Sequence, residues 1–189
     1  MYHVEPNDAL IVVDPQNDFL PGGSLAVAEG NRIFEPINRL MPIFRYVVAS
    51  RDWHPRDHAF FQAYGGPWPF HCLAGTRGAE FSPLLNANDV DEIVSKGTDR
   101  KTDGYSAFAG TALADRLHAH GVRRIFIAGI ATDYCVKRTA LDARDAGFDV
   151  VVVSDAVAGI DATPGDQERA IAEMREQGVT FADSHAIRA

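Results

Sequence analysis

The sequence has few cysteines, no excess of basic residues and no long apolar run. Only Cys72 and Cys135 occur among 189 residues, in unlike local contexts, so a disulfide framework is a poor interpretation and at least one thiol should be free. The formal net charge of -8 argues against a surface that neutralises phosphate backbones. No segment approaches the roughly 20 apolar residues of a membrane span, and the first residues do not resemble a signal peptide. We therefore expect a cytoplasmic protein that binds neither nucleic acid nor membrane.

The length and composition predict one globular domain over residues 1–189. The chain is 46% hydrophobic and 23% charged, which is enough apolar content to bury a core. No internal repeat, low-complexity tract or linker divides it. Whether the domain forms a homo-oligomer stays open from the sequence.

Short apolar runs are the main signal for strands. Runs of four or five mostly apolar residues, bounded by polar residues or proline, are typical of strands buried on both faces. They occupy residues 9–13, 46–49, 92–95, 124–128 and 149–153, with a weaker candidate at 179–182.

Helical patterns separate most of these runs. Residues 111–120 carry Leu113 and Leu117 four apart, and residues 134–146 end before a glycine. A third helix is expected to begin with Thr163 as N-cap and Pro164 in its first turn, and to end at Gly178. Strands that alternate with helices predict an α/β fold with three layers, α/β/α, around a mainly parallel six-stranded sheet.

Residues 52–88 break this alternation. The stretch is rich in Gly, Pro, aromatic residues and His and shows no clear period. Loops of this length inside compact domains are usually functional. Ligands of open parallel sheets bind outside the carboxyl ends of the strands, so this loop and the strand ends are where the chemistry should lie.

Four reactive residue types follow the predicted strands. Asp14 comes directly after the first run, Asp52 follows the second and Lys96 the third, and Cys135 comes after the fourth run and a short turn. Taken singly, an Asp in such a place often caps a turn and a Lys is often merely solvated. Their combination at one sheet edge predicts an active site.

Cys135 is the candidate nucleophile. It follows the turn at residues 129–133 and falls in the first turn of a predicted helix. The positive end of the helix dipole and a nearby ammonium should both favour its thiolate. A buried structural cysteine is the alternative, and we prefer that alternative for Cys72.

The beginning of the long loop resembles a metal site. Asp52 and His54 are two apart in extended chain and point the same way, and the loop can bring His71 to the same ion. One carboxylate and two imidazoles leave coordination positions open, and zinc, iron and manganese all tolerate this donor set. His58 is either a further ligand or a neighbour. The alternative is a set of solvated loop histidines.

Several segments together resemble the nicotinamidase branch of the isochorismatase-like hydrolases, over almost the whole chain. The resemblance implies that Cys135 is the nucleophile, Asp14 the general base, Lys96 the lysine of the catalytic group, and Asp52, His54 and His71 the metal ligands. The matching segments are VVDPQNDFLPGGSL from Val12, SRDWHPRDH from Ser50, GPWPFHC from Gly66, VSKGTD from Val94, YSAF from Tyr105 and GIATDYCV from Gly129.

The same resemblance implies a substrate pocket and an oxyanion hole. Phe19 and Trp68 match the aromatic residues on either face of the pyridine ring, and Tyr105 matches a pocket aromatic, although large rings are also common in cores. A cis peptide between Ile130 and Ala131 is implied. It would turn the amides of Ala131 and Cys135 toward one point.

The implied reaction is hydrolysis of nicotinamide, an aromatic carboxamide, to nicotinate and ammonia through a cysteine thioester. Pyrazinamide hydrolysis is expected as well, with a divalent ion, zinc first among the candidates, orienting the ring. One rival is an isochorismatase-type or carbamoyl-amide hydrolase; as far as the resemblance goes, isochorismatase-type enzymes lack the Asp-x-His plus His metal set. The other is a catalytically silent metal-binding protein of the same fold.

Overall fold

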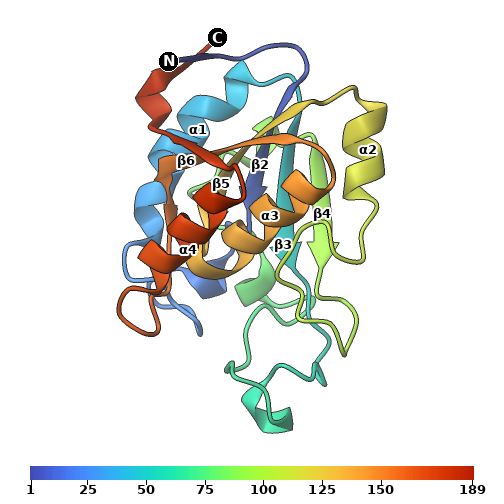
Figure 1. The fold of residues 1–189 in the computed structure, drawn as a ribbon. Coiled ribbons are helices and arrows are strands. Elements are labelled where there is room, and N and C mark those ends of the chain that lie inside the picture. Colours follow the sequence, from blue (N-terminus) through green and yellow to red (C-terminus); the bar gives the residue numbers. More distant parts are fainter.

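A six-stranded parallel sheet forms the centre of the molecule, as the computed structural model of residues 1–189 shows (Figure 1). The strand order is β4-β3-β2-β5-β6-β7, and every neighbouring pair is parallel. The predicted fold class is therefore confirmed. The strands are β2 (Asp8–Val13), β3 (Val47–Asp52), β4 (Glu92–Lys96), β5 (Arg124–Ile130), β6 (Asp149–Ala158) and β7 (Thr180–Ala182).

Helices cover both faces of the sheet. The α-helices are α1 (Phe34–Leu40), α2 (Leu113–Ala119), α3 (Lys137–Asp145) and α4 (Asp166–Glu176), and none is long and apolar enough to cross a bilayer. A π-helical turn, η7 (Thr132–Val136), leads into α3. Short 3-10 turns are η1 (Asn17–Phe19), η2 (Gly30–Ile33), η3 (Met41–Ile43), η4 (Gln62–Tyr64), η5 (Arg77–Ala79), η6 (Ala87–Asp89) and η8 (Ser184–Ala186).

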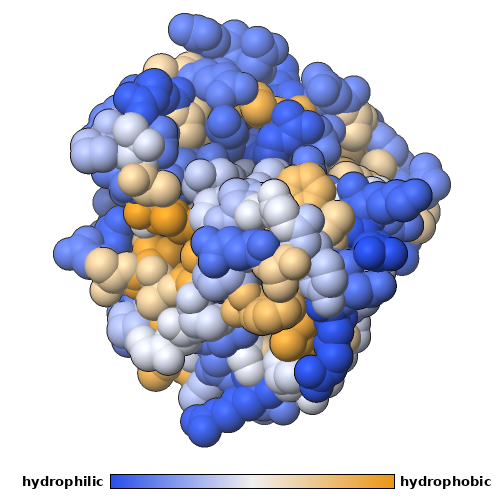
Figure 2. Space-filling view, turned by 90° about the horizontal axis from the view of Figure 1, so that it is seen from below, coloured by the Kyte–Doolittle hydropathy of each residue, from blue (hydrophilic) through white to orange (hydrophobic).

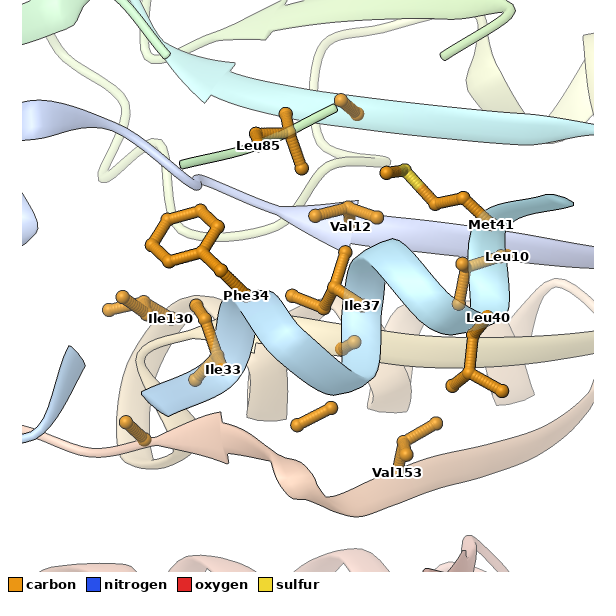
Figure 3. Packing of buried hydrophobic residues seen from close by; sticks show 14 of the residues in the cluster. Leu10, Val12, Ile33, Phe34, Ile37, Leu40, Met41, Leu85, Ile130 and Val153 are labelled. Atoms are coloured by element: carbon orange, nitrogen blue, oxygen red, sulfur yellow. The ribbon is translucent and has the colours of Figure 1, made fainter. Parts of the chain in front are cut away.

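Alternation along β2 divides the core into two clusters. Leu10 and Val12 pack on the side of α1, whereas Ala9, Ile11 and Val13 pack on the side of α2, α3 and α4. Figure 3 shows α1 lying along the sheet with its apolar side chains turned toward the strands. Both faces of β2 are fully buried, which is why the strand appears in the sequence as an unbroken apolar run.

Two details differ from the sequence prediction. Helix α4 begins at Asp166, so Thr163 is not its N-cap and Pro164 is not in its first turn. The reason is Gly165, whose left-handed φ of 89° breaks the chain direction just before the helix, while the Asp166 carboxylate accepts the Thr163 N–H. The sequence also gave no sign of α1, or of the small parallel pair β1 (Tyr2–His3) and β8 (Ile187–Arg188) beside the termini.

The strand order places a topological switch between β2 and β5. From this point the chain moves outward to β3 and β4 on one side and to β6 and β7 on the other. Gly129 lets β5 approach β2 closely here, because a Cβ at this position would lie 2.1 Å from the Val13 carbonyl oxygen. Ligands of such sheets bind outside the carboxyl ends of the strands at the switch. In Figure 1 the long loop after β3 extends beyond this same end, opposite the termini.

Candidate active site

Lys96 joins the reactive residues predicted at the strand ends. Its ammonium nitrogen lies 2.7 Å from Asp14 Oδ2, 2.6 Å from Asp52 Oδ1 and 3.5 Å from Cys135 Sγ. All four side chains are buried. The structure therefore brings together the residues that the sequence placed after four different strands.

The ends of the strands hold the acid and the lysine. Asp14 follows β2 directly, and its N–H donates to the carbonyl of Ser50 in the neighbouring strand β3 (3.1 Å). The Ser50 hydroxyl donates to Asp14 Oδ1 (2.7 Å), which leaves Oδ2 facing the ammonium. Lys96 is the last residue of β4, and its ammonium also donates to the Gly104 carbonyl (2.8 Å).

Cys135 lies in the π-helical turn that follows β5. The peptide between Ile130 and Ala131 is cis, as the resemblance implied. Asp133 ties this turn to the loop after β6, because its carboxylate accepts the N–H groups of Ile160 (3.0 Å) and Asp161 (2.8 Å). The turn that carries the thiol is therefore attached both to β5 and to the loop after β6.

Burial disfavours the thiolate form of Cys135. It raises the pKa of Cys135 well above its ordinary value; Lys96 opposes this, and the two nearby carboxylates add to it. The ammonium acts in the direction that the sequence predicted, because it favours the thiolate, but burial acts against it, and a sequence does not show how completely a group is desolvated. A base has to take the proton when the thiol reacts.

Asp14 has the pKa of such a base. Burial raises its pKa to about 6; the Lys96 ammonium opposes the rise, and the Asp52 carboxylate adds to it. The same ammonium is surrounded by two carboxylates that outweigh its desolvation and hold the pKa of Lys96 well above the usual range. A permanently charged lysine and an acid that titrates near neutrality suit proton transfer to and from sulfur.

Asp52, His54 and His71 form a buried group whose ligand atoms all lie within 4.8 Å of one another. Asp52 Oδ2 is 3.4 Å from His54 Nε2 and 3.9 Å from His71 Nε2. His54 Nδ1 lies 2.8 Å from the Gly97 carbonyl oxygen, and His71 Nδ1 lies 2.9 Å from the Pro69 carbonyl oxygen. Each imidazole can therefore donate from Nδ1 and keep the Nε2 lone pair free. This tautomer and donor set fit a divalent metal ion.

Gly97 is needed for the position of His54. Its φ is +61°, and a Cβ there would come within 2.4 Å of the His54 ring. The absent side chain lets the imidazole lie directly against the main chain that anchors it. The metal group therefore depends on a residue that carries no donor side chain.

His58 lies outside the three-residue group. Its ring centroid is 4.4 Å from that of His54, but its Nδ1 accepts the Phe60 N–H (3.3 Å), which places the proton of a neutral ring on Nε2. Burial lowers the pKa of His58 to about 4, which keeps the ring neutral. The Nε2 atom is buried without a hydrogen-bond partner, and a neutral imidazole is also the form that binds metals, so this geometry does not choose between the two alternatives, a further ligand or a neighbour.

A pocket with about 420 Å³ of empty space, part of it open to solvent, joins the metal group to Cys135. Phe19, Trp68 and Tyr105 all line it, together with Ala131. The Trp68 indole N–H donates to the Tyr105 hydroxyl (2.9 Å), which fixes the two rings relative to each other. Figure 2 looks onto this end of the molecule and shows apolar residues gathered there among hydrophilic ones.

The sequence interpretation missed several residues of the pocket wall. Tyr134 was the one it could have found, because it directly precedes the nucleophile; its ring packs edge-on against Trp68 with 4.9 Å between centroids. No pattern marks the others, which reach the pocket through loop geometry. The missed residues are Leu25, Phe60, Asp103, Tyr134 and Ile160. Cys72, by contrast, is fully buried away from this lining, in keeping with a structural role.

The fold and the site together are those of a hydrolase with an α/β fold: a parallel sheet whose switch point holds a thiol, an acid and a lysine next to three residues that could hold a metal ion. The family model for the isochorismatase domain matches residues 8–186. The chain belongs to the isochorismatase family, as its sequence motifs indicated.

Similar proteins of known structure or activity cover nearly the whole chain. A nicotinamidase of Acinetobacter baylyi is 41% identical over 96% of this chain and 94% of its own length. The crystal structure of PnC1 from L. infantum in complex with nicotinate is 40% identical, covers 98% of both chains and superposes with a TM-score of 0.94. A pyrazinamidase of Pyrococcus horikoshii in complex with zinc is 47% identical over 94% of this chain and 99% of its own, with a TM-score of 0.87.

Proposed function

We propose that this protein is a nicotinamidase that hydrolyses nicotinamide to nicotinate and ammonia and also accepts pyrazinamide. The observation that carries the proposal is the Lys96 ammonium, which links Asp14, Cys135 and the metal ligand Asp52 beside one aromatic-lined pocket. Relatives named nicotinamidase, and a structure 40% identical that holds nicotinate, support the assignment.

The first half of the reaction forms a thioester. Asp14 takes the proton of Cys135, and the sulfur attacks the carboxamide carbon. The oxyanion is stabilised by the backbone N–H groups of Ala131 and Cys135, and loss of one such donor typically costs about 2.7 to 4 kcal/mol of barrier. Asp14 then gives its proton to the departing nitrogen, so ammonia leaves as the C–N bond breaks and the C–S bond remains.

The second half regenerates the thiol. A water molecule attacks the thioester carbon while Asp14 accepts its proton. The C–S bond breaks, the carboxylic acid leaves, and the sulfur regains a proton from Asp14. Lys96 stabilises the negative charge that moves between sulfur and carboxylate in both halves, because it lies within 3.5 Å of each group.

Asp52, His54 and His71 would hold the metal ion, and zinc is our first choice because the zinc-bound pyrazinamidase is 47% identical to this chain. When bound, the ion would supply electrostatic attraction for the ring nitrogen and so help to orient the carboxamide. Phe19 and Trp68 enclose the faces of the ring, with Tyr105 fixed through its contact with Trp68. The pocket selects a flat heteroaromatic amide.

The metal group favours this reaction over the rival hydrolases of the family. An isochorismatase-type or carbamoyl-amide hydrolase has no need of two imidazoles with anchored Nδ1 atoms facing one carboxylate. A catalytically silent protein would have no need of an acid whose pKa is raised to about 6 beside a thiol. The nicotinamidase assignment uses both features.

Ammonia release tests the proposal. Nicotinamide and benzamide should be compared with the zinc-loaded protein, because benzamide has the same shape and lacks the ring nitrogen. We expect rapid release from nicotinamide, slower release from benzamide, and loss of this preference after the metal is removed. A protein that contains metal and releases no ammonia from nicotinamide or pyrazinamide would contradict the proposed function.

A further inference from the structure

Gln16 takes no part in the reaction proposed above, yet it is completely buried beside a metal ligand. Its exposed fraction is 0%, and it lies two residues after Asp14, where the chain has left strand β2. A buried side-chain amide is costly unless its polar atoms are satisfied. Its partners therefore show what it holds in place.

The amide of Gln16 is paired with the main chain of Asp52 on both sides. The Asp52 N–H donates to Gln16 Oε1 (2.8 Å), and Gln16 Nε2 donates to the Asp52 carbonyl (2.8 Å). The second N–H of the same nitrogen donates to the Ala79 carbonyl (2.9 Å). One side chain thus joins the end of β3 to the loop around η5.

The reason for this arrangement lies in the β2–β3 ladder. The last main-chain bond between the two segments runs from Asp14 N–H to the Ser50 carbonyl (3.1 Å). Two residues further along β3, the N–H and carbonyl of Asp52 face the same side, because strand residues alternate. The chain of β2 has already turned away there, and the Gln16 amide takes the place of the missing strand residue.

The pairing bears on the metal site through the Asp52 carboxylate. One oxygen lies 2.6 Å from Lys96 Nζ and the other faces the two imidazoles, so the carboxylate would serve both the ammonium and a bound ion. A short Asp side chain can serve both only if its main chain is held at one place. On the other edge, strand β4 holds Asp52 through the pairing with Lys96.

We propose that Gln16 is a positioning residue for metal binding, which acts by fixing the main chain of Asp52. The inference rests on the proposed metal site and concerns the affinity of that site, not the chemistry at Cys135. Replacing a residue that hydrogen-bonds to a metal ligand and orients it typically weakens metal binding about 10- to 100-fold.

Asn38 provides a matched control. Its side chain makes the same two-point pairing with a loop, because its Nδ2 donates to the Leu84 carbonyl (2.8 Å) and its Oδ1 accepts the Asn86 N–H (2.9 Å). Neither loop residue belongs to the metal group or lines the pocket. Removing this amide disturbs loop attachment without touching Asp52.

The test is the zinc dissociation constant of the full chain, measured by competition with a chelator. We expect Gln16→Met to weaken zinc binding about 10- to 100-fold, and Asn38→Leu to leave it within about twofold of the wild type. Gln16→Glu keeps an acceptor for the Asp52 N–H and loses both donors. It should therefore weaken binding as well, and it carries the test if the methionine variant does not fold.

Folded Gln16 variants that bind zinc within twofold of the wild type would overturn the inference, as would an equal loss in Asn38→Leu. The outcome is separable from that of the proposed function. If the wild type binds zinc but releases no ammonia from nicotinamide, the function fails while the affinities of the variants still decide the role of Gln16.

Discussion

Asp14 and Asp52 are two buried carboxylates that share one ammonium and nevertheless differ in pKa. Lys96 Nζ lies 2.7 Å from the first and 2.6 Å from the second. Burial raises the pKa of both, yet the pKa of Asp14 settles at about 6, whereas the pKa of Asp52 falls below its ordinary value because Lys96 and His54 outweigh the burial.

The difference comes from the second partner of each acid. Asp14 faces the negative charge of Asp52, which raises its pKa by more than the hydrogen bond from the Ser50 hydroxyl lowers it, while Asp52 faces two imidazoles that lower its pKa. The first acid can therefore carry a proton near neutral pH and the second stays an anionic ligand. Neighbouring acids whose pKa values are pushed apart are typical of sites that divide proton transfer from binding.

Cys135→Ala should have the largest effect, because it removes the reaction beside Asp14 and leaves metal binding by Asp52 in place. Removing the nucleophile beside Asp14 should lower the turnover of nicotinamide by at least about 10⁴-fold. The metal group does not include the thiol, so the metal content should stay at the wild-type level. Steady-state kinetics together with elemental analysis check both expectations. Near-normal turnover in the alanine variant would rule out the covalent mechanism.

Lys96→Met removes the cation that both acids share. Two buried carboxylates would lose their partner, and breaking a buried ion pair on one side typically costs about 3 to 5 kcal/mol of folding free energy. Urea denaturation at pH 8 measures the change. The control is Lys137→Met, which breaks the partly exposed pair with Glu173 and should cost less than about 1 kcal/mol. Equal losses in the two variants would show that the buried ammonium has no special role.

His71→Ala tests the role of Asp52 and its neighbours in metal binding. The site loses one of its two imidazoles, so metal affinity should fall by at least about 100-fold, and kcat/KM for nicotinamide should fall with it, while the Cys135 side keeps its geometry. Inductively coupled plasma analysis and kinetics measure the two effects. His118→Ala, which removes an exposed imidazole that packs on Phe148, is the control and should keep its metal. A full equivalent of tightly bound metal in the His71 variant would contradict the ligand assignment.

Much of this site could be predicted from the sequence because parallel strands gather their carboxyl ends. Asp14 and Cys135 come after strands with clear apolar runs, and Lys96 ends the less apolar strand β4, so their meeting follows from the parallel topology. Asp52 ends β3, and His54 and His71 lie in the long loop that follows it; their donor chemistry is recognisable without coordinates.

The features that the sequence did not show depend on burial and on loop geometry. Burial raises the pKa of the Cys135 thiol, and the extent of burial cannot be read from neighbours along the chain. The sequence gives no sign that Gln16 is buried, because its hydrogen-bond partner Asp52 is 36 residues away in the chain. The start of α4 was misplaced because Gly165, not Thr163, sets the direction of the chain.

The pH dependence of kcat/KM follows from Asp14. This acid works as a base only when it is deprotonated, and its pKa of about 6 lies above the ordinary value of 3.8. The rate constant should therefore be flat above pH 7 and fall about tenfold per pH unit well below the midpoint of the titration. Metal content is to be followed at each pH, since protonated histidines release metal. A loss of activity that follows only the loss of metal would assign the acid limb to the imidazoles instead.

Ser50→Ala sharpens this pH prediction and should have the smallest effect. The hydroxyl donates to Asp14 Oδ1 and lowers the pKa of that carboxylate, so its removal should move the acid midpoint upward by about one pH unit. Activity at pH 8 should change little, because Asp14 is ionised there in both proteins. Ser82→Ala, another buried serine whose hydroxyl contacts only the loop at Leu84, should leave the midpoint unchanged. A midpoint that stays in place or moves downward in the Ser50 variant would show that a group other than Asp14 controls the acid limb.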